Sequence, residues 1–203
     1  MPVPPLPVPR LLVITDRRQA VLPLPQLLER VFAAGCRWAS VREKDLPPQD
    51  RLDLVRRLIP IARHHGARLT VHGDLAAAAL CDGVHLGAGG DVAGARARLG
   101  AQALVGISRH HPGEGLGGAD YATLSPIFET ASKPGYGPAL GAQALSRLPG
   151  ALALGGITPA NAAQARAAGA AGLAVMGTVM RASDPGAVVR DLLAAWGLSP
   201  LSG

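Results

Sequence analysis

The chain has 203 residues, 48% of them apolar, which is enough for one domain that buries about 70% of its unfolded surface. It has no uninterrupted apolar run of the length that a transmembrane helix needs, so we expect no contact with the membrane interior. The net charge of +6 comes from basic residues that are scattered and lack neighbouring aromatic residues, which argues against a nucleic-acid surface.

The first ten residues are proline-rich and lack the charged start and apolar core of a signal peptide. We therefore expect residues 1–10 to form a short arm and residues 11–203 to form a single cytoplasmic domain. Cys36 and Cys81 are far apart and have no metal-type spacing, which predicts two reduced, buried thiols. The sequence leaves open whether the chain forms a homo-oligomer.

Strands alternate with helices along nearly the whole chain. Short apolar runs indicate the strands, and apolar residues at helical spacing or capping residues indicate the helices. The expected strands are 11–15, 38–42, 68–72, 83–86, 103–107, 121–125, 151–154 and 172–176. The expected helices are 24–34, 49–65, 75–81, 92–99, 139–148, 184–196, one from 159 to the glycine at 169, and one that begins at 177.

This alternation predicts a parallel sheet with short right-handed crossovers. The repeated units fit an α/β fold of one compact domain, a single (β/α)₈ TIM barrel. A doubly wound open sheet is the alternative. It is less favoured because no strand is followed by the glycine pattern G-x-G-x-x-G.

Glycines follow the last two expected strands. Gly155 and Gly156 end one strand and Gly177 ends the next, so a ligand can approach the backbone closely there. Thr158 can cap the helix between them, with Pro159 at its first position. The loops after strands 7 and 8 of such barrels often bind phosphate, so we predict phosphate binding at these glycines. Glycines placed for packing alone are the alternative.

Basic residues follow the second expected strand. Arg42 and Lys44 are two positions apart and point to the same side, so together they can hold one anionic ligand. A salt bridge to Asp16 or Glu43 is the alternative. Lys44 and Lys133 are the only lysines in an arginine-rich chain, which suggests that both positions need a compact ammonium group.

The longest turn-rich loop follows the sixth expected strand. It contains Thr130, Ser132 and Lys133 among glycines and prolines. Such a loop can close over a phosphate or diphosphate as a lid.

Histidines differ in how well they are placed for chemistry. His72 ends its strand and should reach the mouth of the barrel, where it is the best-placed residue for proton transfer near neutral pH. His85 lies inside an apolar strand and is expected in the core. His110 and His111 begin a glycine-rich loop and are expected in solvent.

Several segments together resemble the thiamine phosphate synthase superfamily. They are ITDR (14–17), SVREK (40–44), GVHLG (83–87), VGIS (105–108), ADYATLSPIFETASKPGYGP (119–138), LALGGITPAN (152–161) and GLAVMG (172–177). The resemblance covers nearly the whole chain in order and implies a (β/α)₈ barrel. Two activities are known in the superfamily. The synthase joins a pyrimidine methyl diphosphate to hydroxyethylthiazole phosphate and releases diphosphate with the help of Mg²⁺, and the thiazole tautomerase aromatises a carboxylated thiazole phosphate.

The resemblance also implies roles for particular residues. The groups on the diphosphate and pyrimidine side would be Arg42, Lys44, Ser108, Thr130, Ser132 and Lys133. The thiazole phosphate site would be formed by Gly155, Gly156 and Gly177. The small-molecule partner common to both activities is a thiazole phosphate.

The chain departs from the synthase pattern where that pattern has metal ligands. The synthase has Asn-Asp after its third strand, where this chain has His72-Gly73, and a second Asp after GVHLG, where this chain has Ala-Gly-Gly. Mg²⁺ prefers carboxylate ligands, and only Asp74 and Asp91, each shifted, could replace the missing pair. We therefore make no firm prediction of a cofactor. Mg²⁺ is expected only if the chain is a synthase.

These departures make the tautomerase the favoured expectation, with His72 as the group that transfers the proton. The tautomerase branch can carry a histidine where this chain has Pro126, so His72 would have to replace it. The synthase is the alternative. A non-catalytic sensor that binds thiazole phosphate is a further alternative.

Overall fold

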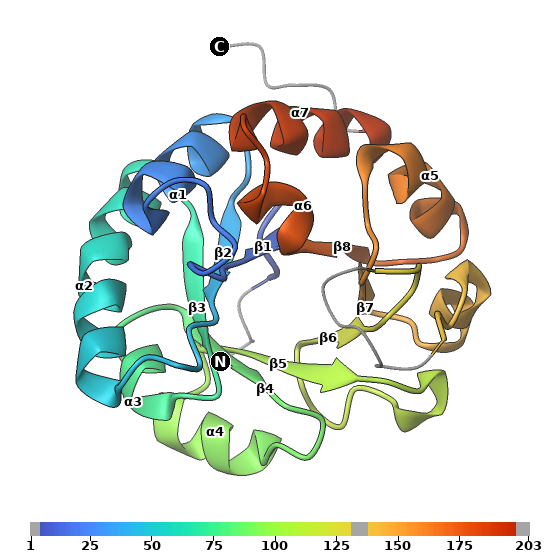
Figure 1. Ribbon diagram of the computed structural model, residues 1–203. Coiled ribbons are helices and arrows are strands. Elements are labelled where there is room, and N and C mark those ends of the chain that lie inside the picture. Colours follow the sequence, from blue (N-terminus) through green and yellow to red (C-terminus); the bar gives the residue numbers. More distant parts are fainter. Residues whose placement is uncertain (1–4, 131–137, 198–203) are drawn as a thin grey trace.

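Eight parallel strands close into a barrel in the computed structural model, which describes residues 5–130 and 138–197. Each strand pairs with the next along the chain, and β1 pairs with β8 (Figure 1). The strands are β1 (Leu11–Ile14), β2 (Trp38–Val41), β3 (Arg68–His72), β4 (Gly83–Leu86), β5 (Leu104–Arg109), β6 (Tyr121–Leu124), β7 (Ala151–Leu154) and β8 (Gly172–Val175). The predicted (β/α)₈ TIM barrel is therefore confirmed, and the closure between β1 and β8 excludes the open sheet.

Most of the helices surround the barrel, whereas the short α6 (Gly177–Met180) is drawn inside this ring, near β1 and β8 (Figure 1). The other helices are α1 (Leu24–Ala33), α2 (Pro48–His64), α3 (Leu75–Ala78), α4 (Val92–Leu99), α5 (Pro159–Ala167), α7 (Pro185–Ala195) and two short 3₁₀ helices, η1 (Pro112–Glu114) and η2 (Ala142–Arg147). The apolar spacing of α1 buries Leu24, Leu27, Leu28, Val31 and Phe32 against the barrel.

Two expected helices are shorter than the sequence predicted. The helix expected at 75–81 ends at Ala78, and the bonds Leu80 N–H to Ala77 O and Cys81 N–H to Ala78 O tighten the chain after it. The helix expected at 139–148 is the 3₁₀ helix η2, which begins after Gly141 at φ +76°. Short segments of this kind bury too few residues for a regular α-helix to be favoured.

The barrel interior is filled near the beginnings of the strands. Leu12 and Ile14 of β1 point inward, whereas Leu11 and Val13 pack outward against helices, as the two-residue repeat of a strand requires. The inner cluster consists of Leu12, Ile14, Trp38, Tyr121, Leu152 and Ala174. Because this end is filled, the open space of the barrel lies at the carboxyl ends of the strands.

Both cysteines are free thiols; Cys36 is buried and Cys81 is partly buried. Burial raises the pKa of the Cys36 thiol to about 12 and that of the Cys81 thiol to about 11. Both thiols are therefore protonated near neutral pH. Within the described residues, no helix combines the length and the apolar character needed to cross a membrane.

Candidate active site

The carboxyl ends of the strands surround a cavity of about 820 Å³. The predicted site residues that line it are Arg42, Lys44, His72, Ser108, Thr130, Gly155, Gly156 and Gly177. Ser132 and Lys133 lie outside the described residues. The structure thus gathers the described members of the predicted set around one space, and the role of each remains a prediction.

Arg42 and Lys44 line the cavity, while Glu43 between them points the other way. Glu43 is buried and accepts hydrogen bonds from Thr15 Oγ1 at 2.7 Å and from the Arg17 backbone N–H at 3.1 Å. The Thr15 hydroxyl in turn accepts from the Arg42 backbone N–H at 3.0 Å. These hydrogen bonds join the ends of β1 and β2 and fix the backbone that carries Arg42 and Lys44. They also show that Glu43 pairs with Arg17, at 3.3 Å, and not with Arg42.

Two positive charges therefore lie close together at the end of β2. Burial lowers the pKa of the Lys44 ammonium, and the Arg42 guanidinium lowers it further. An anion bound between them would reverse the second effect, because an opposite charge favours the protonated ammonium. This part of the cavity is accordingly suited to a negatively charged ligand.

His72 and His85 are paired across β3 and β4, and their rings are 4.5 Å apart between centroids. His85 is buried, with Nδ1 3.1 Å from the Tyr121 hydroxyl and Nε2 3.1 Å from Ser108 Oγ. Burial, with a smaller effect of the charge on Lys44, lowers the pKa of His85 to about 3, so its ring is neutral near pH 7. His85 is buried as expected, but it also lines the cavity. The structure adds that His85 orients Ser108 at the edge of the cavity.

The glycines after β7 serve the packing of two loops. Gly155 and Gly156 have φ values of +92° and +65°, which favour glycine. A Cβ on Gly156 would lie 2.3 Å from the Glu129 carbonyl oxygen, and one on Gly155 would lie 2.8 Å from Pro126 Cα. The Phe128 N–H also donates to the Gly155 carbonyl at 3.0 Å. Close packing of the two loops therefore requires glycine at both positions. Phosphate binding there stays a prediction.

Gly177 lies beside a cation that the sequence analysis did not select. A Cβ on Gly177 would lie 2.4 Å from Arg181 Nη1, so the guanidinium covers the face that glycine leaves open. Arg181 lines the cavity and donates to Gln19 Oε1. Thr178 Oγ1 donates to the Ile157 carbonyl at 2.7 Å and ties the loop after β8 to the loop after β7.

The start of α5 agrees with its sequence signals. Thr158 is the N-cap and Pro159 is the first helical residue, as predicted. The Thr158 N–H donates to Asn161 Oδ1 at 2.8 Å, and Asn161 Nδ2 donates to the Gly156 carbonyl at 2.8 Å. Gly169, at φ +94°, follows the C-cap residue of α5. Asn161 thus joins the helix cap to the glycine loop.

The cavity residues that the sequence analysis did not select include Arg51, His110 and Arg181. Arg51 is on α2 and forms an ion pair with Asp74 at 2.7 Å. His110 was expected in solvent, but it lines the cavity and its Nδ1 lies 3.1 Å from the Ser125 carbonyl. Arg181 follows Gly177 by four residues, which places both on the same side of a helix, so its helical spacing could have identified it.

The two carboxylates considered for Mg²⁺ do not form a pair. Asp74 caps α3, where Oδ1 accepts from the Ala77 N–H at 3.0 Å and Oδ2 accepts from Arg51 at 2.7 Å. Asp91 caps α4, accepts from a backbone N–H of that helix at 2.9 Å, and is not among the residues that line the cavity. Mg²⁺ requires oxygen ligands in near-octahedral geometry, and these engaged carboxylates do not fit that requirement.

A family model and sequence relatives show the family of this chain. A family model described as thiamine monophosphate synthase matches residues 11–179. A thiamine-phosphate synthase of Laribacter hongkongensis is 38% identical over 183 residues, covering 85% of this chain and 87% of that protein. A thiamine biosynthesis bifunctional protein, ThiM/ThiE, of Symbiobacterium thermophilum is 42% identical over 181 residues; the match covers 83% of this chain and 38% of the longer protein. A solved thiamine phosphate pyrophosphorylase from Pyrococcus furiosus has a TM-score of 0.80 at 26% identity, and the match covers 92% of this chain and 94% of that one.

These relatives overturn the expectation of a thiazole tautomerase. The relative named as a thiamine-phosphate synthase matches 85% of this chain, so the tautomerase expectation is wrong. That expectation was based on two missing aspartates. The cations Arg42 and Lys44, which suit a diphosphate equally well, line the cavity. The position of His72 in the cavity stands, but its expected role in aromatisation does not.

Proposed function

This chain belongs to the thiamine monophosphate synthase family, and we propose on that premise that it is a thiamine-phosphate synthase. It would join a pyrimidine methyl diphosphate to hydroxyethylthiazole phosphate and release diphosphate. The supporting relatives are 38% and 42% identical, and a solved pyrophosphorylase has the same fold. The proposal therefore concerns a group transfer between two phosphorylated small molecules.

One observation of the structure carries the proposal: cationic side chains line the cavity after two different strands. Arg42 and Lys44 follow β2, whereas Gly177 and Arg181 follow β8, two strands away around the barrel. The cavity of about 820 Å³ is within the range of sites that hold small-molecule ligands. Two phosphorylated substrates require anionic groups to be bound at two places in one cavity.

The reaction places its charge where the cations are. The thiazole nitrogen forms a bond to the methylene carbon of the pyrimidine, and the bond from that carbon to the diphosphate oxygen breaks. The diphosphate takes the bonding electrons, so negative charge grows on its leaving oxygen. We assign Arg42 and Lys44 to the stabilisation of that charge, because fixed cations act most strongly where charge develops in the transition state.

Neighbouring groups would hold the pyrimidine half. Ser108 faces the cavity and is oriented by the neutral ring of His85. Its hydroxyl can donate to or accept from a substrate. Since Asp74 and Asp91 do not fit a Mg²⁺ site, no step of this proposal depends on a metal held by these carboxylates.

Complementation of a bacterial strain that lacks its own synthase tests the proposal. Expression of the wild-type chain should restore growth without thiamine. Arg42→Ala and Lys44→Ala should each abolish the rescue, because each removes a cation worth about a hundredfold in rate. Arg56→Ala is the matched control, since Arg56 is exposed on α2 and pairs only with Asp53 at 2.8 Å among the interactions described. Failure of the wild-type chain to rescue, or rescue by both cavity variants, would contradict the proposal.

A further inference from the structure

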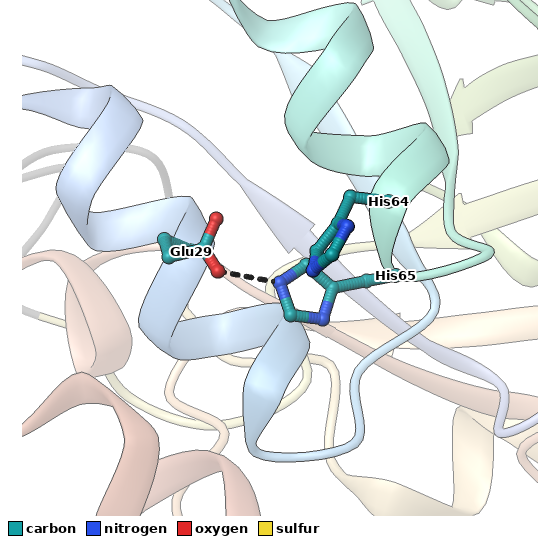
Figure 2. A group of neighbouring side chains, drawn as sticks. All are labelled: Glu29, His64 and His65. Carbon is teal, nitrogen blue, oxygen red and sulfur yellow. Dashed lines mark hydrogen bonds and ion pairs between the residues drawn. The ribbon is translucent and has the colours of Figure 1, made fainter.

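Glu29, His64 and His65 form a side-chain cluster on the outside of the barrel, where α1 meets the end of α2 (Figure 2). One ligand atom from each residue lies within 4.8 Å of the others. Within residues 5–130 and 138–197, this is the only group of three or more histidine, cysteine or acidic residues with ligand atoms so close. The established family and the proposed reaction assign it no role.

The end of α2 brings the two histidines together. His64 is the last residue of the helix, and His65 is its C-cap residue, at φ −93° and ψ 7°. Gly66, at φ +60°, then turns the chain toward β3. The two imidazole rings are 4.9 Å apart between centroids and nearly perpendicular. Adjacent residues inside a helix do not face one another, so the helix end makes this pairing possible.

Two of the three ligands are already held in place. His65 Nε2 lies 2.7 Å from Glu29 Oε1 on α1, and the His65 side chain is only 15% exposed. Its ring also packs against Phe32, with 6.1 Å between centroids. Glu29 and His64 are exposed, so the third ligand can move toward the other two. Ordering of the exposed His64 side chain on binding costs conformational entropy, which limits the affinity.

The chemistry of this set selects a transition metal. Two imidazole nitrogens and one carboxylate oxygen are a ligand set that zinc uses, with water at the fourth position. Mg²⁺ and Ca²⁺ prefer oxygen ligands alone, so the histidines disfavour them. In tetrahedral zinc coordination the ligand atoms lie about 3.3 Å apart. His65 Nε2 and Glu29 Oε1, now 2.7 Å apart, must therefore separate slightly, and His64 must rotate toward them.

We propose that Glu29, His64 and His65 bind one zinc ion that bridges α1 and α2. The ion replaces the proton between His65 Nε2 and Glu29 Oε1, and the ring then carries its proton on Nδ1. The cluster lies just before Arg68, the first residue of β3, whereas the cavity residue His72 is the last residue of that strand. The zinc is therefore at the opposite end of the barrel from the cavity and acts on stability.

Zinc titration of the untagged, chelator-treated full chain tests the proposal, with calorimetry for binding and thermal unfolding for stability. We expect one zinc per chain with a dissociation constant on the order of micromolar. Because zinc binds the folded state, a hundredfold excess over that constant should raise the Tm by about 5 °C. Glu29→Gln and His64→Gln should each weaken binding about tenfold or more and remove the shift.

His111→Gln is the matched control, since His111 is an exposed histidine outside the cluster and beside another histidine. It should bind zinc as the wild type does. Circular dichroism of each variant without zinc excludes misfolding. Thiamine phosphate formation should be the same for wild type and Glu29→Gln, so this test is independent of the proposed reaction. Absence of binding, binding unchanged in both cluster variants, or binding without a rise in Tm would each overturn the proposal.

Discussion

Lys44 shows how a single residue depends on its neighbours. Its backbone is held in place because the neighbouring Glu43 accepts hydrogen bonds from Thr15 and Arg17. The positive charge of Arg42 disfavours a second positive charge on Lys44. Burial and that guanidinium lower the pKa of Lys44 in the ligand-free protein. Its ammonium is therefore ready to pair with an anion and is neutralised more easily than that of an ordinary lysine.

The pH dependence of the rate tests the role of Lys44. Below its lowered pKa, Lys44 is charged and binds the diphosphate; above it, the charge is lost and binding weakens. We expect kcat/KM to fall on the alkaline side at a lower pH than the usual lysine range. Lys44→Arg stays charged throughout and should remove this fall, while lowering the rate about tenfold because the compact ammonium is gone. An unchanged alkaline fall in this variant would show that another group titrates.

Asp74 lines the cavity, and both of its carboxylate oxygens already accept hydrogen bonds from protein groups. Asn at this position can still cap α3, because its side-chain oxygen can accept from the Ala77 N–H. We expect Asp74→Asn to change the Mg²⁺ concentration for half-maximal rate by less than about twofold, since a protein ligand to the metal would matter far more. Steady-state rates measured against Mg²⁺ concentration check this. An increase of tenfold or more would show that Asp74 binds metal after all.

The loops after β6 and β7 are joined by close backbone contact. Gly156 combines a positive φ with a Cβ position only 2.3 Å from the Glu129 carbonyl oxygen. Gly66 has a similar φ of +60°, but a Cβ there would meet nothing within 4 Å. Comparing Gly66 with Gly156 therefore distinguishes the cost of backbone strain from the cost of a steric clash.

Urea unfolding of two alanine variants tests this contact. Gly66→Ala should lower the free energy of unfolding by about 1 kcal/mol, from backbone strain alone. Gly156→Ala adds a clash with backbone atoms and should lower it by about 3 kcal/mol or more. Equal losses in the two variants would mean that the loop after β6 moves away freely.

Across the whole molecule, the sequence predicted the barrel better than its loops. Each strand is a short apolar run, and caps such as Thr158 and Asp74 mark where helices begin, so local signals determine the order of elements. The parallel closure follows from that order. The α-helix predicted at 139–148 was wrong, because the few buried residues of the 3₁₀ helix found there do not repeat at α-helical spacing.

Most cavity residues that the sequence selected lie at the end of a strand or in the loop that follows it. Arg42, His72 and Ser108 were found because strand ends meet at one mouth. Arg51 reaches the cavity from a helix, and His110 from a glycine-rich loop, and no local pattern indicates either position. The choice of reaction failed for a related reason, because it was based on two missing aspartates and not on the whole cavity.

Formation of thiamine phosphate by the purified chain tests the central claim most directly. The protein is incubated with the pyrimidine methyl diphosphate and hydroxyethylthiazole phosphate, with Mg²⁺ present, and both products are measured over time. We predict one diphosphate released for each thiamine phosphate formed, at a rate about a hundredfold lower in Lys44→Ala. Binding of both substrates by the folded protein without any thiamine phosphate formed would contradict the claim.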